Sequence, residues 1–223
     1  ASLQDVKDFY KEWYTPNKAV LTIAGDFETG QALDWVKKYF GEIKKGKEVT
    51  KTIVAPIQLA TTKSLYYEDN FAQTARLGMT WPTVPNYHKD SYALELLGTY
   101  LSKGKKAPLN KVVVEGDQVA DQAYAYSYTS ELAGQFSVIA RAYNGIDLDS
   151  VLNSVDKAME LFEKNGISQD DLDRIKTGQE TDFYQGLSSV LGKGFQLTQY
   201  QILAGDAGFL AEDVKNKQAV TVE

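Results

Sequence analysis

Apolar residues recur at helical spacing in several parts of the chain. Residues 2–14 predict the first helix, because large apolar side chains return there every three or four positions. Ser2 and Asp5 have the spacing of a capping box at its start. The same pattern predicts further helices at residues 29–41, 89–101, 108–115 and 147–164, and from Ser168 to about Leu203. Thr29 is the predicted cap of the helix at 29–41, and Gly41 its end. The last helix is expected to be interrupted at Gly186, Gly192 and Gly194.

Other segments alternate with a period of two, which is typical of strands. Val119–Thr129 and Gln135–Tyr143 alternate in this way and predict one hairpin. Lys63–Glu68 and Gln73–Trp81, joined by a turn around Asp69-Asn70, predict a second. Ala19–Ala24 is a compact apolar run that predicts one more strand. Because the strands come mostly as hairpins, the fold class predicted is α+β: a mostly antiparallel sheet with helices packed on one face.

The chain of 223 residues shows no Pro/Gly/Ser-rich linker, so we expect residues 1–223 to form a single domain. It does not begin with Met, which suggests a piece of a longer multi-domain chain. The longest apolar runs are as short as Val112–Val114, far below the ~20 residues of a membrane span. We therefore expect no membrane span.

Composition excludes several kinds of chemistry. One histidine, His88, and no cysteine exclude disulfides, thiol nucleophiles and a zinc site built on two histidines. The formal net charge of -6 argues against nucleic acid as a partner.

Candidate catalytic groups are few. His88, with Asp90 two residues later, has the pattern of a general base and its orienter, but its place at a helix start favours a capping histidine. The glycine-rich phosphate motifs and the G-x-S-x-G nucleophile motif are absent from the sequence. Asp170, Asp171 and Asp173 fall in the first turn of a predicted helix, where negative charge is favoured. We thus expect no catalytic and no metal-binding residue in this chain.

The predicted strands place a distinctive set of side chains on one face of the sheet. Tyr124, Tyr126 and Tyr128 share a face, and Arg76 and Arg141 fall on the corresponding face of their strands. The alternate positions are mostly apolar and should meet the helices. Tyrosine and arginine are enriched where proteins contact peptides, so these five residues are candidates for substrate contact. Ordinary cross-strand pairing on a solvated face is the competing interpretation.

Five segments, taken in order, resemble the non-catalytic domain of the inverzincin zinc metallopeptidases, the pitrilysin/insulinase family. In the first, Tyr14-Thr15-Pro16-Asn17 follows a helix and precedes a strand that ends at Gly25-Asp26. The others are Val36-x-x-Tyr39-Phe40-Gly41, Pro85-x-Tyr87-x-x-Asp90-x-Tyr92 leading to Leu101-Ser102-x-Gly104, Leu109-x-Lys111-x-x-Val114-Glu115, and Ile167-Ser168-x-x-Asp171-Leu172, with Gly205-Asp206 and Ala219-Val220-Thr221 closing the set.

The resemblance implies a metalloprotease-processing-peptidase-like domain that walls a chamber closed over an unfolded peptide. In this family the zinc motif His-x-x-Glu-His lies in a separate domain, and here His88 is followed by Lys89-Asp90-Ser91-Tyr92 instead. Zinc and catalysis are therefore expected in a neighbouring domain of the same chain or of a partner subunit, with peptide as the substrate. A periplasmic or secreted bacterial location is favoured by the same analogy, and a cytoplasmic one stays open.

The sequence departs from the family at one point. Active partner domains often carry an Arg and a Tyr that hold the substrate backbone, whereas here Val114, beside Glu115, stands at the Arg position and the Tyr position falls near Asp121. This favours the second domain of a zinc-bearing half, or a degenerate partner. Two other hypotheses stay open: a structural or assembly domain of the same fold without peptidase activity, and an independent enzyme that uses paired carboxylates.

Overall fold

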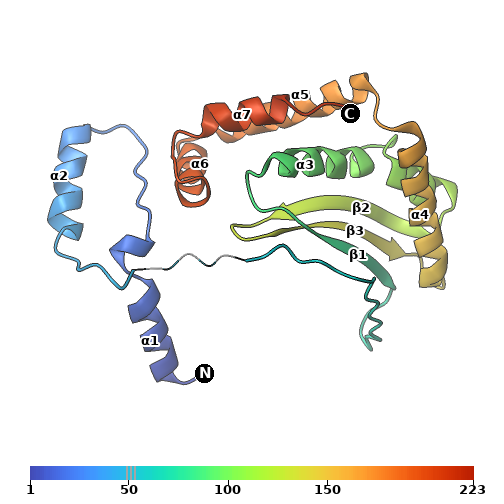
Figure 1. Ribbon diagram of the computed structural model, residues 1–223, viewed down its shortest axis with the longest axis horizontal. Coiled ribbons are helices and arrows are strands. Elements are labelled where there is room, and N and C mark those ends of the chain that lie inside the picture. Colours follow the sequence, from blue (N-terminus) through green and yellow to red (C-terminus); the bar gives the residue numbers. More distant parts are fainter. Residues whose placement is uncertain (49, 51, 53) are drawn as a thin grey trace. The chain divides into compact units, whose positions relative to one another are not determined.

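Three antiparallel strands form a sheet in the order β1-β3-β2 (Figure 1). They are β1 (Arg76–Thr83), β2 (Ala120–Thr129) and β3 (Gly134–Ala142), seen in a computed structural model that describes residues 1–48, 50, 52 and 54–223. β2 and β3 make the predicted hairpin, and β1 pairs with the other side of β3. The predicted α+β class with an antiparallel sheet is confirmed.

The chain divides into two compact units, residues 1–53 with 182–211 and residues 54–181 with 212–223. The first unit holds α1 (Leu3–Trp13), the short η1 (Pro16–Lys18), α2 (Thr29–Phe40) and α6 (Val190–Leu203). The second holds the sheet with α3 (Lys89–Ser102), η2 (Asn110–Gly116), α4 (Leu148–Asn165) and most of α5 (Gln169–Gly186) and α7 (Leu210–Gln218).

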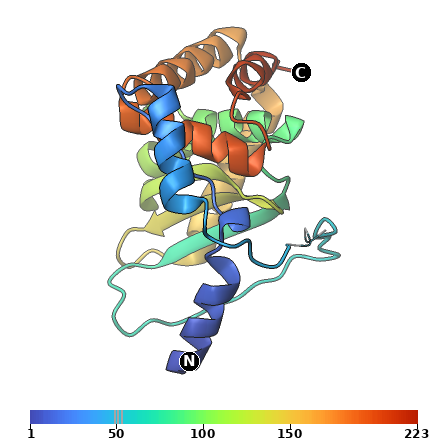
Figure 2. The same ribbon diagram turned by 90° about the vertical axis from the view of Figure 1, so that its left-hand side faces the viewer.

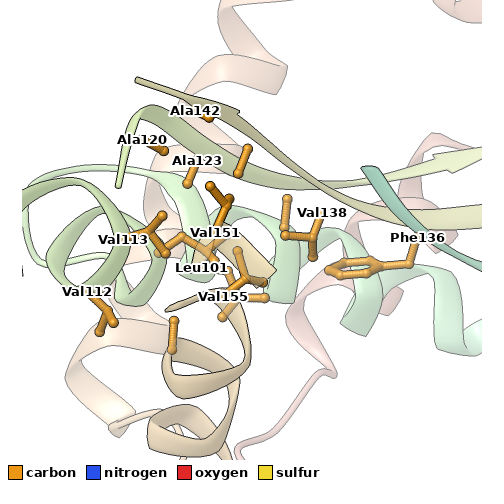
Figure 3. Close-up of a cluster of buried hydrophobic side chains, with 14 residues drawn as sticks. Leu101, Val112, Val113, Ala120, Ala123, Phe136, Val138, Ala142, Val151 and Val155 are labelled. Carbon is orange, nitrogen blue, oxygen red and sulfur yellow. The ribbon is translucent and has the colours of Figure 1, made fainter. Parts of the chain in front are cut away.

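The core of the second unit lies between the sheet and its helices. Figure 3 shows side chains from β2 and β3, such as Ala123 and Val138, directed toward Leu101 of α3 and Val151 of α4. Both views place α3 over one face of the sheet (Figures 1 and 2). The apolar strand positions therefore meet the helices as predicted, because burying them removes their surface from water.

Several helix ends follow the predicted chemistry. Ser2 and Asp5 form both hydrogen bonds of the capping box, and Ser168 accepts a hydrogen bond from the backbone N of Asp171. Three details differ. Glu28 occupies the N-cap of α2, so that Thr29 is already helical. Of the three predicted interruptions Gly186, Gly192 and Gly194, only Gly186 ends a helix, because α6 runs through the other two. η2 starts at Asn110 and has a wider turn than an α-helix.

Two predicted strands are not strands in this structure. Ala19–Ala24 and Lys63–Glu68 form no ladder, so the predicted hairpin of Lys63–Glu68 with Gln73–Trp81 is wrong. Residues 54–75 instead form a long loop, drawn in teal in Figure 2. A strand exists only where a neighbour accepts and donates its backbone hydrogen bonds, and Leu65 in this loop is 99% exposed. The local sequence pattern alone therefore predicted more strands than the sheet contains.

α7 is a helix that the sequence analysis missed. Its few apolar residues make no stripe, and its buried side chain is Asp213, which is ion-paired with Lys217 at 3.2 Å. Next to it, Lys176 of α5 donates hydrogen bonds to the backbone oxygens of Gln218 and Val220. Because polar contacts hold this segment in place, hydrophobic periodicity gave no signal for it.

Candidate functional site

The five candidate residues share the face of the sheet that points away from α3, called here the outer face. Arg76 of β1 lies directly opposite Arg141 of β3. Tyr126 and Tyr128 of β2 lie opposite Ser137 and Gln135 of β3. Side chains that are directly opposite in a ladder point to the same side, so this part of the face prediction is confirmed.

The tyrosines form a row along β2 whose exposure rises toward the hairpin. Tyr124 is half-buried and stacks on Tyr126, with ring centroids 6.1 Å apart and an interplanar angle of 25°. Ser137, opposite Tyr126, is only 1% exposed and is within hydrogen-bond distance of Thr80, with the hydroxyl oxygens 3.0 Å apart. The outer face thus presents aromatic rings beside a hydroxyl pair in which Ser137 is buried and Thr80 is exposed.

Arg141 is held by a carboxylate on the neighbouring strand. Its Nε donates to Oδ1 of Asp121 at 2.8 Å and its Nη2 donates to Oδ2 at 2.6 Å. These hydrogen bonds lower the pKa of the Asp121 carboxyl and raise the pKa of the Arg141 guanidinium. Both groups are therefore charged at neutral pH, and the planar fork of Arg141 has a fixed orientation.

A β-bulge brings Asp121 to the outer face. Ala120 pairs with Ala142 and Gln122 pairs with Arg141, which leaves Asp121 as an extra residue between them. A strict alternation through β2 would place Asp121 on the same side as the buried Ala123. The partnership of Asp121 with Arg141 was not predicted, because the sequence carries no glycine or other signal of a bulge here.

The two arginines border an open cleft of about 880 Å³. Its other walls include Tyr66 and Glu68 of the long loop and Asp149 at the start of α4. Arg76 forms no ion pair with any residue that the structure describes, so its charge is available to a ligand in this cleft. The structure brings Arg76 and Arg141 together here, whereas the three tyrosines lie outside the cleft lining.

His88 caps α3. Its Nδ1 accepts a hydrogen bond from the backbone N of Asp90 at 3.2 Å, and the nearer carboxylate oxygen of Asp90 is 3.6 Å away. The side chain is 40% exposed and partly open to water. This geometry fits the capping role that the sequence favoured.

The donor groups of the described residues do not fit a zinc site. No group of three His, Cys, Asp or Glu side chains converges anywhere in the described part of the chain. The aspartates at the start of α5 serve the helix instead: Asp171 accepts hydrogen bonds from Ser168 and Arg174, which lower the pKa of its carboxyl. Separately, no helix among the described residues is long and apolar enough to cross a membrane.

Comparison with known proteins identifies the family. Residues 1–179 match a family described as the "Peptidase M16 inactive domain". The zinc protease PqqE of Helicobacter pylori is 26% identical over 192 residues, which cover 84% of this chain and 43% of PqqE.

Solved structures share the fold over most or all of the chain. A protease from Helicobacter pylori matches with a TM-score of 0.82 and 22% identity, covering 100% of this chain and 54% of that one. A chain of Complex III2 from Candida albicans matches with a TM-score of 0.78 and 16% identity, over 100% of this chain and 54% of that one. The periplasmic protease PqqL from Escherichia coli matches with a TM-score of 0.70 and 14% identity, covering 89% of this chain and 22% of PqqL.

The chain spans about half the length of the curated relative and of the first structure that it matches. The expected resemblance to the pitrilysin/insulinase peptidases is confirmed by the family match over four fifths of the chain and by the zinc protease among its relatives. The chain therefore belongs to the Peptidase M16 inactive-domain family, a family of non-catalytic domains of zinc proteases.

Proposed function

We propose that this chain is the non-catalytic part of a zinc-dependent metallopeptidase and that residues 1–223 act in it as one domain. It packs against a separate zinc-bearing domain and forms one wall of the chamber that receives the peptide. The zinc and the hydrolytic chemistry belong to that other domain, and the isolated chain has no activity. The observation that carries this proposal is the match of residues 1–179 to a domain described as inactive.

The outer face supports a role in holding peptide. It combines aromatic rings with two cations, and such side chains contribute strongly to contacts between proteins and peptides. Arg141 is preoriented by Asp121, and Arg76 stands beside it at the edge of a cleft. We propose that a peptide in the chamber contacts Arg76, Tyr124, Tyr126, Tyr128 and Arg141.

A matched pair of arginine variants tests this assignment in the full-length protein. Arg141→Ala removes a guanidinium from the outer face, and Arg174→Ala removes one of similar exposure from α5, where it pairs with Asp171. We expect Arg141→Ala to raise KM for peptide cleavage about fivefold with kcat unchanged, because a binding contact is lost. Arg174→Ala should leave both constants unchanged. If the two variants had the same KM and kcat, the proposal that the outer face borders the peptide chamber would be wrong.

A structural or assembly role without peptidase activity is the alternative function. Its support is the shared fold with a chain of Complex III2 from Candida albicans. Hydrolysis of an unstructured peptide by the full-length protein, lost on chelation and restored by zinc, would exclude this alternative. Complete inactivity of the zinc-loaded full-length protein would favour it.

We propose a periplasmic or secreted location in a bacterium. The family membership and the fold shared with the periplasmic protease PqqL support it. Fractionation of cells into periplasm and cytoplasm, followed by detection of the full-length protein, tests this directly.

A further inference from the structure

The tripeptide Asn-Gly-Ile occurs twice in the sequence, at residues 144–146 and 165–167. Asparagine is chemically labile when glycine follows it, because the glycine nitrogen, with no Cβ beside it, can reach the carbonyl carbon of the asparagine side chain. In both copies the asparagine and the glycine are exposed and the isoleucine is half-buried. Local sequence and exposure therefore give no reason for the two copies to differ in reactivity.

The first copy forms a tight turn between β3 and α4. The backbone N–H of Ile146 donates a hydrogen bond to the backbone oxygen of Tyr143 at 3.1 Å, so that Asn144 and Gly145 are the central residues of a β-turn. Gly145 has a φ of +84°, which glycine adopts without strain. Its own N–H donates no hydrogen bond to any residue that the structure describes. This nitrogen can therefore lose its proton to solvent and act as a nucleophile.

The second copy ends α4, and its glycine nitrogen is engaged. Asn165 is the last residue of the helix, and the N–H of Gly166 donates to the backbone oxygen of Phe162 at 2.7 Å. This bond, from one residue to the fourth before it, closes a helical turn and directs the N–H along the helix axis. It must break before the nitrogen can attack the side chain of Asn165. Local structure thus distinguishes two copies that have the same sequence.

We propose that Asn144 is a site of spontaneous deamidation and that Asn165 is protected from it. The nitrogen of Gly145, after giving its proton to water or hydroxide, forms a bond to Cγ of Asn144, and the side-chain nitrogen takes up a proton and leaves as ammonia. One water molecule then opens the cyclic imide. Attack of this water at Cγ gives aspartate. Attack at the main-chain carbonyl carbon gives isoaspartate, in which the main chain runs through the former side chain.

Both products alter one border of the cleft that Arg141 lines. The turn leads into Ile146, Asp147 and Leu148, which line the same cleft. Each product carries a carboxylate in place of a neutral amide, and isoaspartate also adds a carbon to the main chain of the turn. Asp147 caps α4 by accepting a hydrogen bond from the backbone N of Ser150. We expect the isoaspartate form to melt at a lower temperature, because the lengthened turn displaces this cap.

Incubation of the full-length protein at mildly alkaline pH, followed by digestion with pepsin and mass spectrometry, tests the proposal. The peptides that contain residues 144 and 165 are scored for conversion of the amide to a carboxylate. We expect residue 144 to convert at least about tenfold faster than residue 165, because breaking a hydrogen bond of ordinary strength changes an equilibrium by about that factor. In protein unfolded with urea the two rates should be similar, since the hydrogen bond of Gly166 is then absent.

A pair of glutamine variants gives an independent readout. Glutamine has to close a six-membered ring, which forms much more slowly than the five-membered imide of asparagine. Asn144→Gln should therefore keep its melting temperature during the incubation, while the natural chain accumulates a form that melts lower. Asn165→Gln is the matched control and should change with time as the natural chain does.

Several results would overturn the proposal or part of it. Equal rates at residues 144 and 165 in the folded protein, or a faster rate at residue 165, would refute it. So would an unconverted residue 144 in folded protein when both residues of the unfolded protein have reacted. Conversion of residue 144 with an unchanged melting temperature would confirm the site and refute the effect on the cap of α4. None of these results depends on peptidase activity, so the site is tested separately from the proposed function.

Discussion

Arg141 and Asp121 face each other because β2 carries one residue more than β3 at this position. The bulged Asp121 lies between Ala120, which is fully buried against the helices, and Gln122, which pairs with Arg141 on the outer face. The ion pair is therefore a consequence of strand geometry, and it fixes the orientation of the only arginine on β3. Bulges of this kind commonly redirect a side chain near a functional site.

The bulge predicts an unusual tolerance to deletion. Deleting Asp121 restores regular alternation, keeps Ala120 against the helices and should leave a chain that unfolds cooperatively with a slightly lower melting temperature. Deleting Tyr124 moves Ala123 to the outer face and turns Gln122 inward, and should abolish cooperative unfolding. Thermal melts followed by circular dichroism distinguish the two. A deletion of Asp121 as damaging as that of Tyr124 would contradict the register.

Gly98 allows α3 to approach β2 closely. A Cβ at this buried position would lie 3.1 Å from the Cα of Tyr126 and 3.4 Å from the backbone oxygen of Ala125, so that the backbones of α3 and β2 would have to move apart by a few tenths of an ångström. We expect Gly98→Ala to lower the free energy of unfolding by about 1–3 kcal/mol, as overpacking does. Urea denaturation provides the measurement.

Gly178 of α5 is the control for this substitution, because a Cβ there would meet no atom within 4 Å. Gly178→Ala should raise the free energy of unfolding by about 0.5–1 kcal/mol through its effect on helix propensity. The two changes thus have opposite signs. A neutral Gly98→Ala would show that α3 and β2 do not pack as described.

Asp117 connects the end of η2 to α4 and should make stability depend on pH. Its carboxylate accepts hydrogen bonds from Lys157 at 2.7 Å and from the buried Ser154 at 2.8 Å. These bonds lower its pKa below the ordinary value of 3.8, mainly through the contact with Lys157. A lowered pKa in the folded state stabilises the protein above the unfolded pKa, and this stabilisation is lost as the pH falls through the folded pKa.

Asp117→Asn should therefore reduce the melting temperature at pH 7, with a difference from the natural chain that shrinks as the pH falls below 3.8. Asp156→Asn on α4, next to Lys157, is the control, because Asp156 makes no hydrogen bond or ion pair with any described residue. It should give a small difference at every pH. A pH-independent effect of Asp117→Asn would contradict the role of its charge.

Local patterns predicted the part of the fold in which they coincide with tertiary contacts. Ala123, Ala125 and Val138 lie at the alternate positions that were predicted to meet the helices, and the structure buries all three. Residues 63–68 were also predicted as a strand, but no neighbouring strand pairs with them in the structure. α7 lacks an apolar stripe and is held through Asp213. Periodicity detects faces; it does not detect which strands pair or which helices are held by polar groups.

The sequence predicted the shared face of the candidate residues, but neither the ion pair of Arg141 nor the cleft beside it. The common face of Arg76 and Arg141 followed from alternation, and the ladder confirms it. The bidentate contact of Arg141 with Asp121 did not follow, because a bulge changes the alternation without a distinctive residue. The cleft beside the arginines also depends on the path of residues 66–76, which no local pattern predicts.

The measurement that tests the central claim most directly is hydrolysis of an unstructured peptide by purified residues 1–223, in the presence and absence of added zinc, with the full-length protein beside it. A non-catalytic domain predicts no hydrolysis by residues 1–223 under either condition and zinc-dependent hydrolysis by the full-length protein. Peptide hydrolysis by residues 1–223 alone, unchanged by a chelator, would contradict the account.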